Sequence, residues 1–185
     1  LVAADGKHET VARALEALVP ADLQSLAIGQ QRYSQLLNDD GGILDDLMVT
    51  RPKAPKTDGM LFLVVNAACK EADYAHIAAR LPAGVRLVTV TDRALIAIQG
   101  PAAARVMARL APKSATLKFM TGASGEVGPF DCHVSRSGYT GEDGFEISIA
   151  ARHAVEAWNL LLGDAEVQPV GLGARDSLRL EAGLC

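Results

Sequence analysis

Short apolar runs and helical stripes of apolar residues alternate along the chain and predict a mixture of strands and helices. Residues 1–3 are typical of the end of a strand. Further strands are predicted over residues 30–37, 43–49, 60–66, 85–91, 94–99, 130–137 and 145–149. Helices are predicted from Asp5-Gly6 to Pro20, around 74–81, from Pro101 to Pro112, around 154–162, and over 173–180.

Turn signals join most of the strands as hairpins and set the helices apart. Residues 38–42, Asn-Asp-Asp-Gly-Gly, suit the left-handed backbone of a tight hairpin. The glycine-rich stretch 122–128 lacks the strand-then-helix context of a dinucleotide site and is predicted to be a surface loop. The pattern predicts an α+β fold of two mainly antiparallel sheet units with flanking helices. The boundary is predicted near residues 82–84, which gives units over 1–84 and 85–172 and a helix at 173–185.

Composition narrows the classes of function. A length of 185 residues suits one large or two small domains, and 49% apolar residues can form a buried core. A net charge of −4 argues against a dedicated nucleic-acid surface, which would need a basic excess. No apolar run is long enough for a membrane span, and the first residues lack the pattern of a signal peptide. We therefore expect neither nucleic acid nor membrane as a partner.

Cysteine and histidine show no pattern of a metal or redox site. Cys69, Cys132 and Cys185 are far apart and form no CxxC pair, so we interpret them as small buried thiols in a reducing compartment. The four histidines have no metal-ligand spacing. No metal site is expected.

Two adjacent acids, Asp45 and Asp46, follow the 38–42 turn on a predicted strand. Because successive side chains on a strand point to opposite faces, one of them should face the covered side of the sheet and the other should face water. A carboxylate on a covered face needs a partner or a role, because burial of an unpaired charge is costly. A solvated strand edge or turn is the alternative interpretation.

Residues 138–146 are a second candidate, because Gly138, Gly141 and Gly144 recur there at every third position. The stretch is acidic and has no Lys, so it is unlike a phosphate-binding loop. Glu146 could accept two parallel N–H bonds from an amino-substituted heterocycle. A glycine hairpin that carries surface acids is the alternative.

Arg175 is the third candidate. If Gly173 is the N-cap of the last helix, Arg175 lies in the first helical turn, where a cation opposes the helix dipole by roughly 0.3–1 kcal/mol. An acid such as Asp176 or Glu181 would offset that cost, and so would a ligand. The residues alone leave both interpretations open.

Six segments, taken in order, resemble one enzyme family. They are RYS at 32–34, GGILDDL at 41–47, VVNA at 64–67, LIAIQGP at 95–101, GYTGEDGFEI at 138–147 and GARDSLRLEAG at 173–183. This string resembles the glycine cleavage T-protein family of tetrahydrofolate-dependent aminomethyltransferases, and the resemblance covers essentially the whole chain. It implies the T-protein folate-binding domain fold, with the helix at 173–185 returning toward the first unit.

The resemblance also implies a reaction and its partners. The lipoyl arm of the H-protein carries an aminomethyl group, and the family transfers its one-carbon unit to tetrahydrofolate, releasing ammonia and the reduced arm. Lipoylated H-protein is therefore the expected partner and tetrahydrofolate the expected one-carbon acceptor. The expected location is the cytoplasm in a bacterium or the mitochondrial matrix in a eukaryote.

Residue by residue, the resemblance gives a site. Asp45 matches the family's key acid, which lies near N10 of folate and helps that nitrogen attack, with Asp46 as a structural partner on the opposite face. Glu146 matches the acid that binds the pterin. The remaining matches to the folate cavity are Tyr33, Asn66, Tyr139 and Arg175. Glu142 is interpreted as loop structure.

Two alternatives and one departure accompany this interpretation. Sarcosine and dimethylglycine dehydrogenases carry a related folate module, and a folate-binding relative acts in iron–sulfur cluster assembly. The second has a KGCYxGQE-type motif, whereas residues 137–142 here are SGYTGE. Because the family chain is roughly twice as long, we expect this chain to be a central fragment, inactive or weakly active alone.

Overall fold

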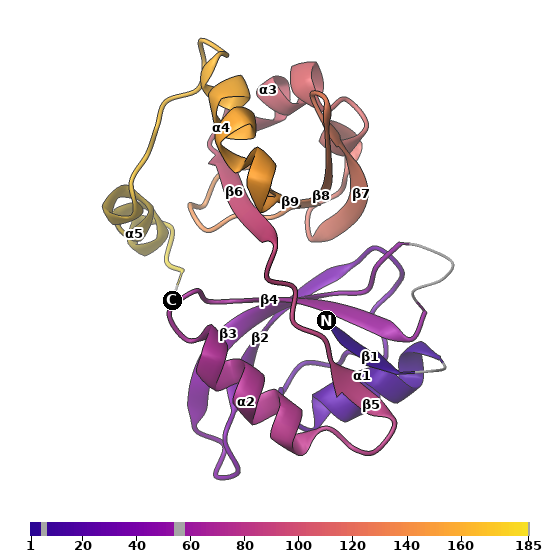
Figure 1. The fold of residues 1–185 in the computed structure, drawn as a ribbon. Coiled ribbons are helices and arrows are strands. Elements are labelled where there is room, and N and C mark those ends of the chain that lie inside the picture. The colour runs from indigo at the N-terminus through magenta and orange to yellow at the C-terminus, as the bar shows by residue number, and fades with distance from the viewer. Residues whose placement is uncertain (5–6, 54–57, 185) are drawn as a thin grey trace. The chain divides into compact units, whose positions relative to one another are not determined.

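Antiparallel pairing joins the strands of the computed structural model into two sheets, one in each half of the chain (Figure 1). The structure describes residues 1–4, 7–53 and 58–184, and the chain divides into two compact units, unit 1 (Leu1–Thr91) and unit 2 (Asp92–Cys185). The predicted α+β class, with two antiparallel sheets and flanking helices, is confirmed. The predicted turn and helix start at Asp5-Gly6 lies outside the described residues.

Unit 1 contains a five-stranded sheet in the order β2-β3-β4-β1-β5. The strands are β1 (Val2–Ala4), β2 (Gln31–Leu37), β3 (Ile43–Thr50), β4 (Met60–Val65) and β5 (Val85–Leu87). Helices α1 (His8–Glu16) and α2 (Lys70–Arg80) complete the unit. Leu15 of α1 and Ile77 of α2 are fully buried in one core with Leu36, Leu47 and Val49 of the sheet. The apolar stripes of both helices therefore cover the same sheet face.

Unit 2 contains a four-stranded sheet in the order β6-β9-β8-β7. The strands are β6 (Arg93–Gln99), β7 (Thr121–Val127), β8 (Phe130–Arg136) and β9 (Gly144–Ala150). The helices are α3 (Ala103–Leu110), α4 (Ala154–Leu162) and α5 (Leu172–Glu181), with short 3-10 turns η1 (Ser114–Thr116) and η2 (Ala151–His153). Phe145 and Ile147 of β9 are buried with Met107 of α3 and Leu161 of α4, so α3 and α4 cover one face of this sheet.

The division between the units follows the strand pairing. β5 pairs with β1, with Val2 opposite Leu87 and Ala4 opposite Val85. This pairing places residues 85–87 in the sheet of unit 1, and the division falls between Thr91 and Asp92, after the turn at 82–84. The sheet to which a short edge strand belongs is decided by the strand it pairs with, and the sequence pattern does not show that β5 pairs with β1.

The predicted surface loop at 122–128 is wrong, because these residues form most of β7. Every residue of β7 pairs with β8, from Thr121 opposite Arg136 to Val127 opposite Phe130. A Cβ at Gly122 would lie 2.8 Å from the His133 imidazole. The glycine therefore makes room for a cross-strand side chain, and its low strand propensity is overridden by packing.

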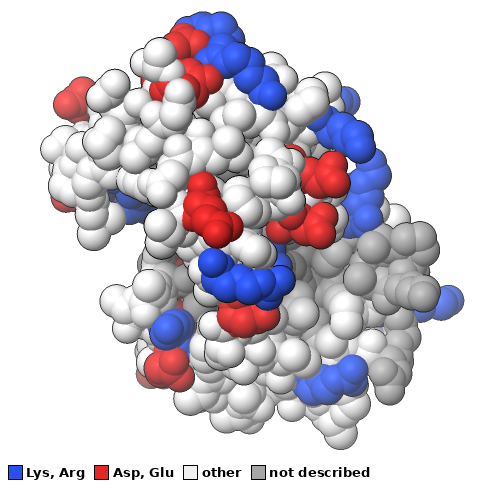
Figure 2. All heavy atoms as spheres, turned by 45° about the horizontal axis from the view of Figure 1, so that its top comes forward, with Lys and Arg blue, Asp and Glu red and all other residues white. Residues whose placement is uncertain are grey.

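Figure 2 shows how charged side chains are distributed on one face of the molecule. On the face shown in Figure 2, acidic and basic residues lie in small groups of both signs, separated by uncharged surface. Within the described part of the chain, none of the helices has the length and apolar character needed to cross a bilayer.

Candidate functional site

The predicted site residues form two groups, one within each unit. Tyr33, Asp45 and Asn66 belong to unit 1, whereas Tyr139, Glu146 and Arg175 belong to unit 2. The first group lies on β2, on β3 and directly after β4, and the second lies on the loop between β8 and β9, on β9 and on α5.

Strand β3 carries both acids of the first group. Asp45 pairs with the buried Leu36 of β2 and has the same parity as Leu47 and Val49, so it lies on the covered face of the sheet. Asp46 pairs with Gln35 and lies on the other face. The predicted alternation is therefore present in the register.

Asn66, directly after β4, brings the two acids together in spite of this alternation. Its Nδ2 donates to Asp45 Oδ1 at 3.0 Å and to Asp46 Oδ1 at 2.5 Å. Tyr33 Oη donates to Asp46 Oδ2 at 3.0 Å. Asp46 thus does not simply face water, because it shares an amide with Asp45 and anchors Tyr33.

The first turn of α2 adds two residues that the sequence reasoning missed, Cys69 and Asp73. Asp73 is 3% exposed, and no donor among the described residues reaches its buried Oδ2. Burial, followed by the hydrogen bond and the charge of Asp45, raises the pKa of Asp73 to about 6. The charge of Asp45, followed by burial, raises the pKa of the Cys69 thiol. We call these six residues the Asp45 cluster: Tyr33, Asp45, Asp46, Asn66, Cys69 and Asp73.

A signal for Asp73 was present in the sequence. Asp73 precedes Ile77 by four residues, and both lie on the buried stripe of α2. An acid at a core position of an amphipathic helix requires a polar partner, because burial of an unpaired carboxylate is costly.

In unit 2, glycines allow the connection between β8 and β9 to approach its neighbours closely. A Cβ at Gly138 would lie 1.9 Å from the Gln99 side chain, and one at Gly144 would lie 2.3 Å from it. Gly141 has a φ of +78°, and a Cβ there would lie 2.6 Å from Ala182, just after α5. The glycine spacing therefore fits the loop between Gln99 and the end of α5.

An ion pair closes the base of this loop. Arg136 donates to Asp143 at 2.9 and 2.6 Å in a bidentate arrangement. It also donates to the carbonyl oxygen of Leu117 at 2.8 Å. The geometry fixes both ends of the segment that carries Tyr139.

A pocket of about 450 Å³ lies beside this loop, and Tyr139, Glu146 and Arg175 all line it. The Arg175 guanidinium lies over the Tyr139 ring, 4.5 Å from its centroid. Glu146 Oε2 accepts a hydrogen bond from Ser137 Oγ at 3.0 Å, which orients the carboxylate. We call this cavity the Tyr139 pocket.

The pocket includes residues that sequence reasoning missed or discounted. Gln99 and Trp158 line it without having been predicted, and Glu142 lines it although it was interpreted as loop structure. Gln99 donates to the carbonyl oxygen of Ser137 at 3.1 Å. Gln99 lies beside Gly138 and Gly144, which are distant from it in the sequence. Its place in the pocket therefore depends on tertiary contacts.

Arg175 itself is placed differently from the prediction. The N-cap of α5 is Gly171 rather than Gly173, so the N–H of Arg175 already bonds to the Gly171 carbonyl within the helix. Asp176 pairs with Arg179 at 2.8 Å. The partner of Arg175 in the structure is the Tyr139 ring, which contributes a cation–π contact of about 0.5–1 kcal/mol.

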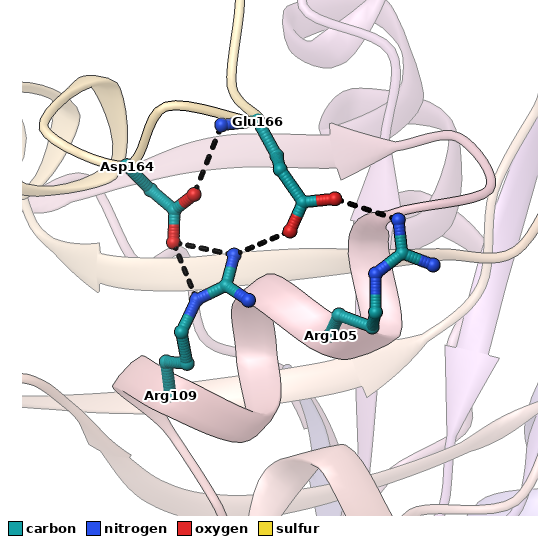
Figure 3. Close-up of polar contacts among 4 residues, drawn as sticks. All are labelled: Arg105, Arg109, Asp164 and Glu166. Carbon is teal, nitrogen blue, oxygen red and sulfur yellow. Dashed lines mark hydrogen bonds and ion pairs between the residues drawn. The ribbon is translucent and has the colours of Figure 1, made fainter.

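A network of ion pairs secures the segment that leads to α5 (Figure 3). Arg109 of α3 contacts Asp164 at 2.6 Å and Glu166 at 2.8 Å, and Arg105 contacts Glu166 at 2.6 Å. Glu166 also lines the Tyr139 pocket, together with Val167, Gln168 and residues 170–172. The network therefore anchors one wall of the pocket to α3.

The chemistry available at the two groups is that of carboxylates, an aromatic ring and one guanidinium. The Tyr139 pocket suits a flat, donor-rich heterocycle, because Glu146 accepts N–H bonds and Tyr139 offers an aromatic wall. The Asp45 cluster can hold or move a proton. Across the described residues, no group of three or more His, Cys, Asp or Glu is placed to hold a metal ion.

Comparison with known proteins adds one family. The model of the GCVT N-terminal domain matches residues 6–185. A probable mitochondrial aminomethyltransferase of Schizosaccharomyces pombe is 42% identical over 183 residues, which cover 97% of this chain and 46% of that protein. The human mitochondrial aminomethyltransferase is 44% identical over 92% of this chain and 43% of its own length.

A solved structure is similar to this chain in fold and in sequence. The glycine cleavage system aminomethyltransferase T of Bartonella henselae superposes with a TM-score of 0.87 at 43% identity, covering 100% of this chain and 48% of that one. The chain therefore spans about half the length of the curated relatives it matches.

Proposed function

The chain belongs to the GCVT N-terminal domain family, and on this basis we propose that it forms the folate-binding part of a tetrahydrofolate-dependent aminomethyltransferase of glycine cleavage. The relatives at 42–44% identity carry the name aminomethyltransferase. That name does not favour the two alternatives, a dehydrogenase-linked folate module and a relative acting in iron–sulfur cluster assembly.

The proposed reaction moves one carbon between two carriers. The C–S bond to the lipoyl arm of the H-protein and the C–N bond to ammonia break, and bonds from the carbon to N5 and N10 of tetrahydrofolate form. Ammonia and the reduced lipoyl arm leave. The products are 5,10-methylenetetrahydrofolate and a dihydrolipoyl H-protein, so lipoylated H-protein is the proposed partner.

The observation that carries the proposal for the folate is the Tyr139 pocket. Glu146 accepts the N–H donors of the pterin there, and Ser137 keeps its carboxylate oriented. Tyr139 packs against the ring system, and Arg175 supplies positive charge at the same wall.

Asp45 is the proposed acid–base residue. Its carboxylate stands beside the folate N10 as that nitrogen attacks the one-carbon unit, where it stabilises developing positive charge and accepts the proton that is released. Asn66 holds one oxygen of Asp45, and Tyr33 holds Asp46 in place. The location of the protein follows its source, the cytoplasm of a bacterium or the mitochondrial matrix of a eukaryote, where the fungal and human relatives are named as mitochondrial.

The test uses the full-length protein with aminomethylated H-protein and tetrahydrofolate. Asp45→Asn should reduce kcat by roughly 100-fold or more, the scale of a lost acid–base or charge-stabilising group. Asp46→Asn is the matched comparison, because it also contacts Asn66, and should reduce kcat much less. Equal losses in the two variants would remove Asp45 from its special role, and no methylenetetrahydrofolate from the wild-type protein would refute the function.

A further inference from the structure

Two buried oxygen atoms of the Asp45 cluster have no ordinary hydrogen-bond donor. Asp45 Oδ2 and Asp73 Oδ2 are both inaccessible to water and neither accepts a hydrogen bond from any N–H or O–H group placed by the structure. Buried polar atoms in proteins almost always have a partner, so such a pair requires an explanation.

Each of the two carboxyls can be the missing hydrogen-bond partner of the other. Asp45 lies on the covered face of β3, and Asp73 lies on the buried stripe of α2, the helix that packs on that face. A hydrogen bond with Asp45 is among the causes that raise the pKa of Asp73. An ionised carboxylate is only an acceptor, so a carboxyl–carboxyl hydrogen bond requires that one of the two carries a proton. Two ionised carboxylates side by side in a buried site repel each other strongly.

We propose that Asp73 is a positioning residue for the reaction, which shares one proton with Asp45 and holds the Asp45 carboxyl between itself and Asn66. The inference rests on the proposed function, since it gives Asp45 its role. Asn66 donates to Oδ1 of Asp45, and in this proposal the protonated Asp73 donates to the buried Oδ2, which no donor among the described residues reaches. A fixed carboxyl meets its substrate without reorganisation.

Few of the neighbouring groups compete with Asp73 and Asp45 for the proton. The Cys69 thiol has a raised pKa and is neutral in the physiological range. Asp46 is occupied by Asn66 and Tyr33, and His76, on the next turn of α2, contacts the Leu37 carbonyl oxygen through Nε2 at 2.9 Å. The raised pKa of Asp73 agrees with a proton that stays on Asp73 into the mildly acid range.

The first experiment follows activity in the full-length protein. Asp73→Ala should lower kcat roughly tenfold or more with a much smaller change in the KM for tetrahydrofolate, because it releases one edge of Asp45. Asp73→Asn keeps a donor of the same shape, so it should recover most of that loss. It should also remove the inflection near pH 6 from the pH profile of kcat, because the shared proton is gone. An unchanged kcat in Asp73→Ala or an unchanged profile in Asp73→Asn overturns the proposal.

The second experiment does not depend on activity. Aspartate labelled with ¹³C at the side-chain carboxyl allows the titration of Asp73 to be followed by NMR in wild type and in Asp45→Asn. Loss of the Asp45 charge should move the Asp73 step to lower pH by roughly one unit. An unmoved step means that the two groups share no proton and refutes the pair. A moved step combined with full activity of Asp45→Asn keeps the pair but overturns its role in the reaction, and in that case the proposed function of Asp45 fails separately.

Discussion

Asp73→Asn is expected to change the pH dependence of stability. The pKa of Asp73 rises from the usual 3.8 to about 6 in the folded chain. Each unit of pKa corresponds to about 1.4 kcal/mol, so ionising Asp73 costs roughly 3 kcal/mol more in the folded state than in the unfolded state.

The sign follows from proton binding. Between pH 3.8 and about 6 the folded state retains the Asp73 proton that the unfolded state releases. The wild-type protein therefore loses stability as the pH rises through this window, and the loss is complete above it. Asparagine has no proton to release, so the free energy of unfolding of Asp73→Asn minus that of wild type should rise by roughly 2 kcal/mol from pH 4 to pH 7, because at pH 4 the unfolded state has already released part of the proton.

Urea unfolding followed by circular dichroism at each pH measures this difference. Asp39→Asn is the control, because Asp39 is exposed and Arg80 lowers its pKa, so its difference from wild type should be nearly flat above pH 5. A difference for Asp73→Asn that has the same value at pH 4 and pH 7 would show that burial and Asp45 do not hold a proton on Asp73.

Two further predictions concern the Tyr139 pocket. Glu146→Gln should weaken tetrahydrofolate binding by roughly tenfold or more in a calorimetric titration, the scale of a lost charge-assisted hydrogen bond. Glu142→Gln, in the more exposed loop, is the control and should weaken binding less. Equal affinities of the two variants would remove Glu146 from the pterin site. Gly144→Ala would place a Cβ 2.3 Å from the Gln99 side chain. The overpacking should destabilise the protein by roughly 1–3 kcal/mol, measured as a lower Tm. The accompanying loss of folate affinity should be relieved by adding Gln99→Ala, and no change in Tm would show that the Gln99 side chain moves aside freely.

The sequence patterns predicted the elements that have strong local signals. The turn at 38–42, the apolar run of β4 and the stripe of α3 depend on neighbours in the chain, so residue order was enough to place them. β7 was missed because its Gly122 makes room for the cross-strand His133, which the sequence does not show. β5 was assigned to the second unit because only its partner β1 reveals its sheet.

The residues of the candidate site also divide into those that the sequence predicts and those that only the fold reveals. Asp45 and Glu146 stand out as acids on strands, and the motifs they belong to were sufficient to propose them. Asp73 lies on α2, 28 residues after Asp45, whereas Gln99 lies on β6 and Trp158 on α4, so their places in the two groups come from tertiary packing. The N-cap of α5 was misplaced by two residues because several glycines occur together and each is a suitable cap.

The ion-pair network at Asp164 and Glu166 has a consequence for the position of α5. From Glu166, held by Arg105 and Arg109 of α3, to Leu172 at the start of α5 there are only six steps of chain, which reach roughly 20 Å when fully extended. The start of α5 therefore stays within that distance of Glu166 as long as the network holds. The cation–π contact between Arg175 and Tyr139, worth about 0.5–1 kcal/mol, is by itself too weak to hold the helix in place. The ion pairs on α3 thus limit how far Arg175 can move from the pocket that it lines.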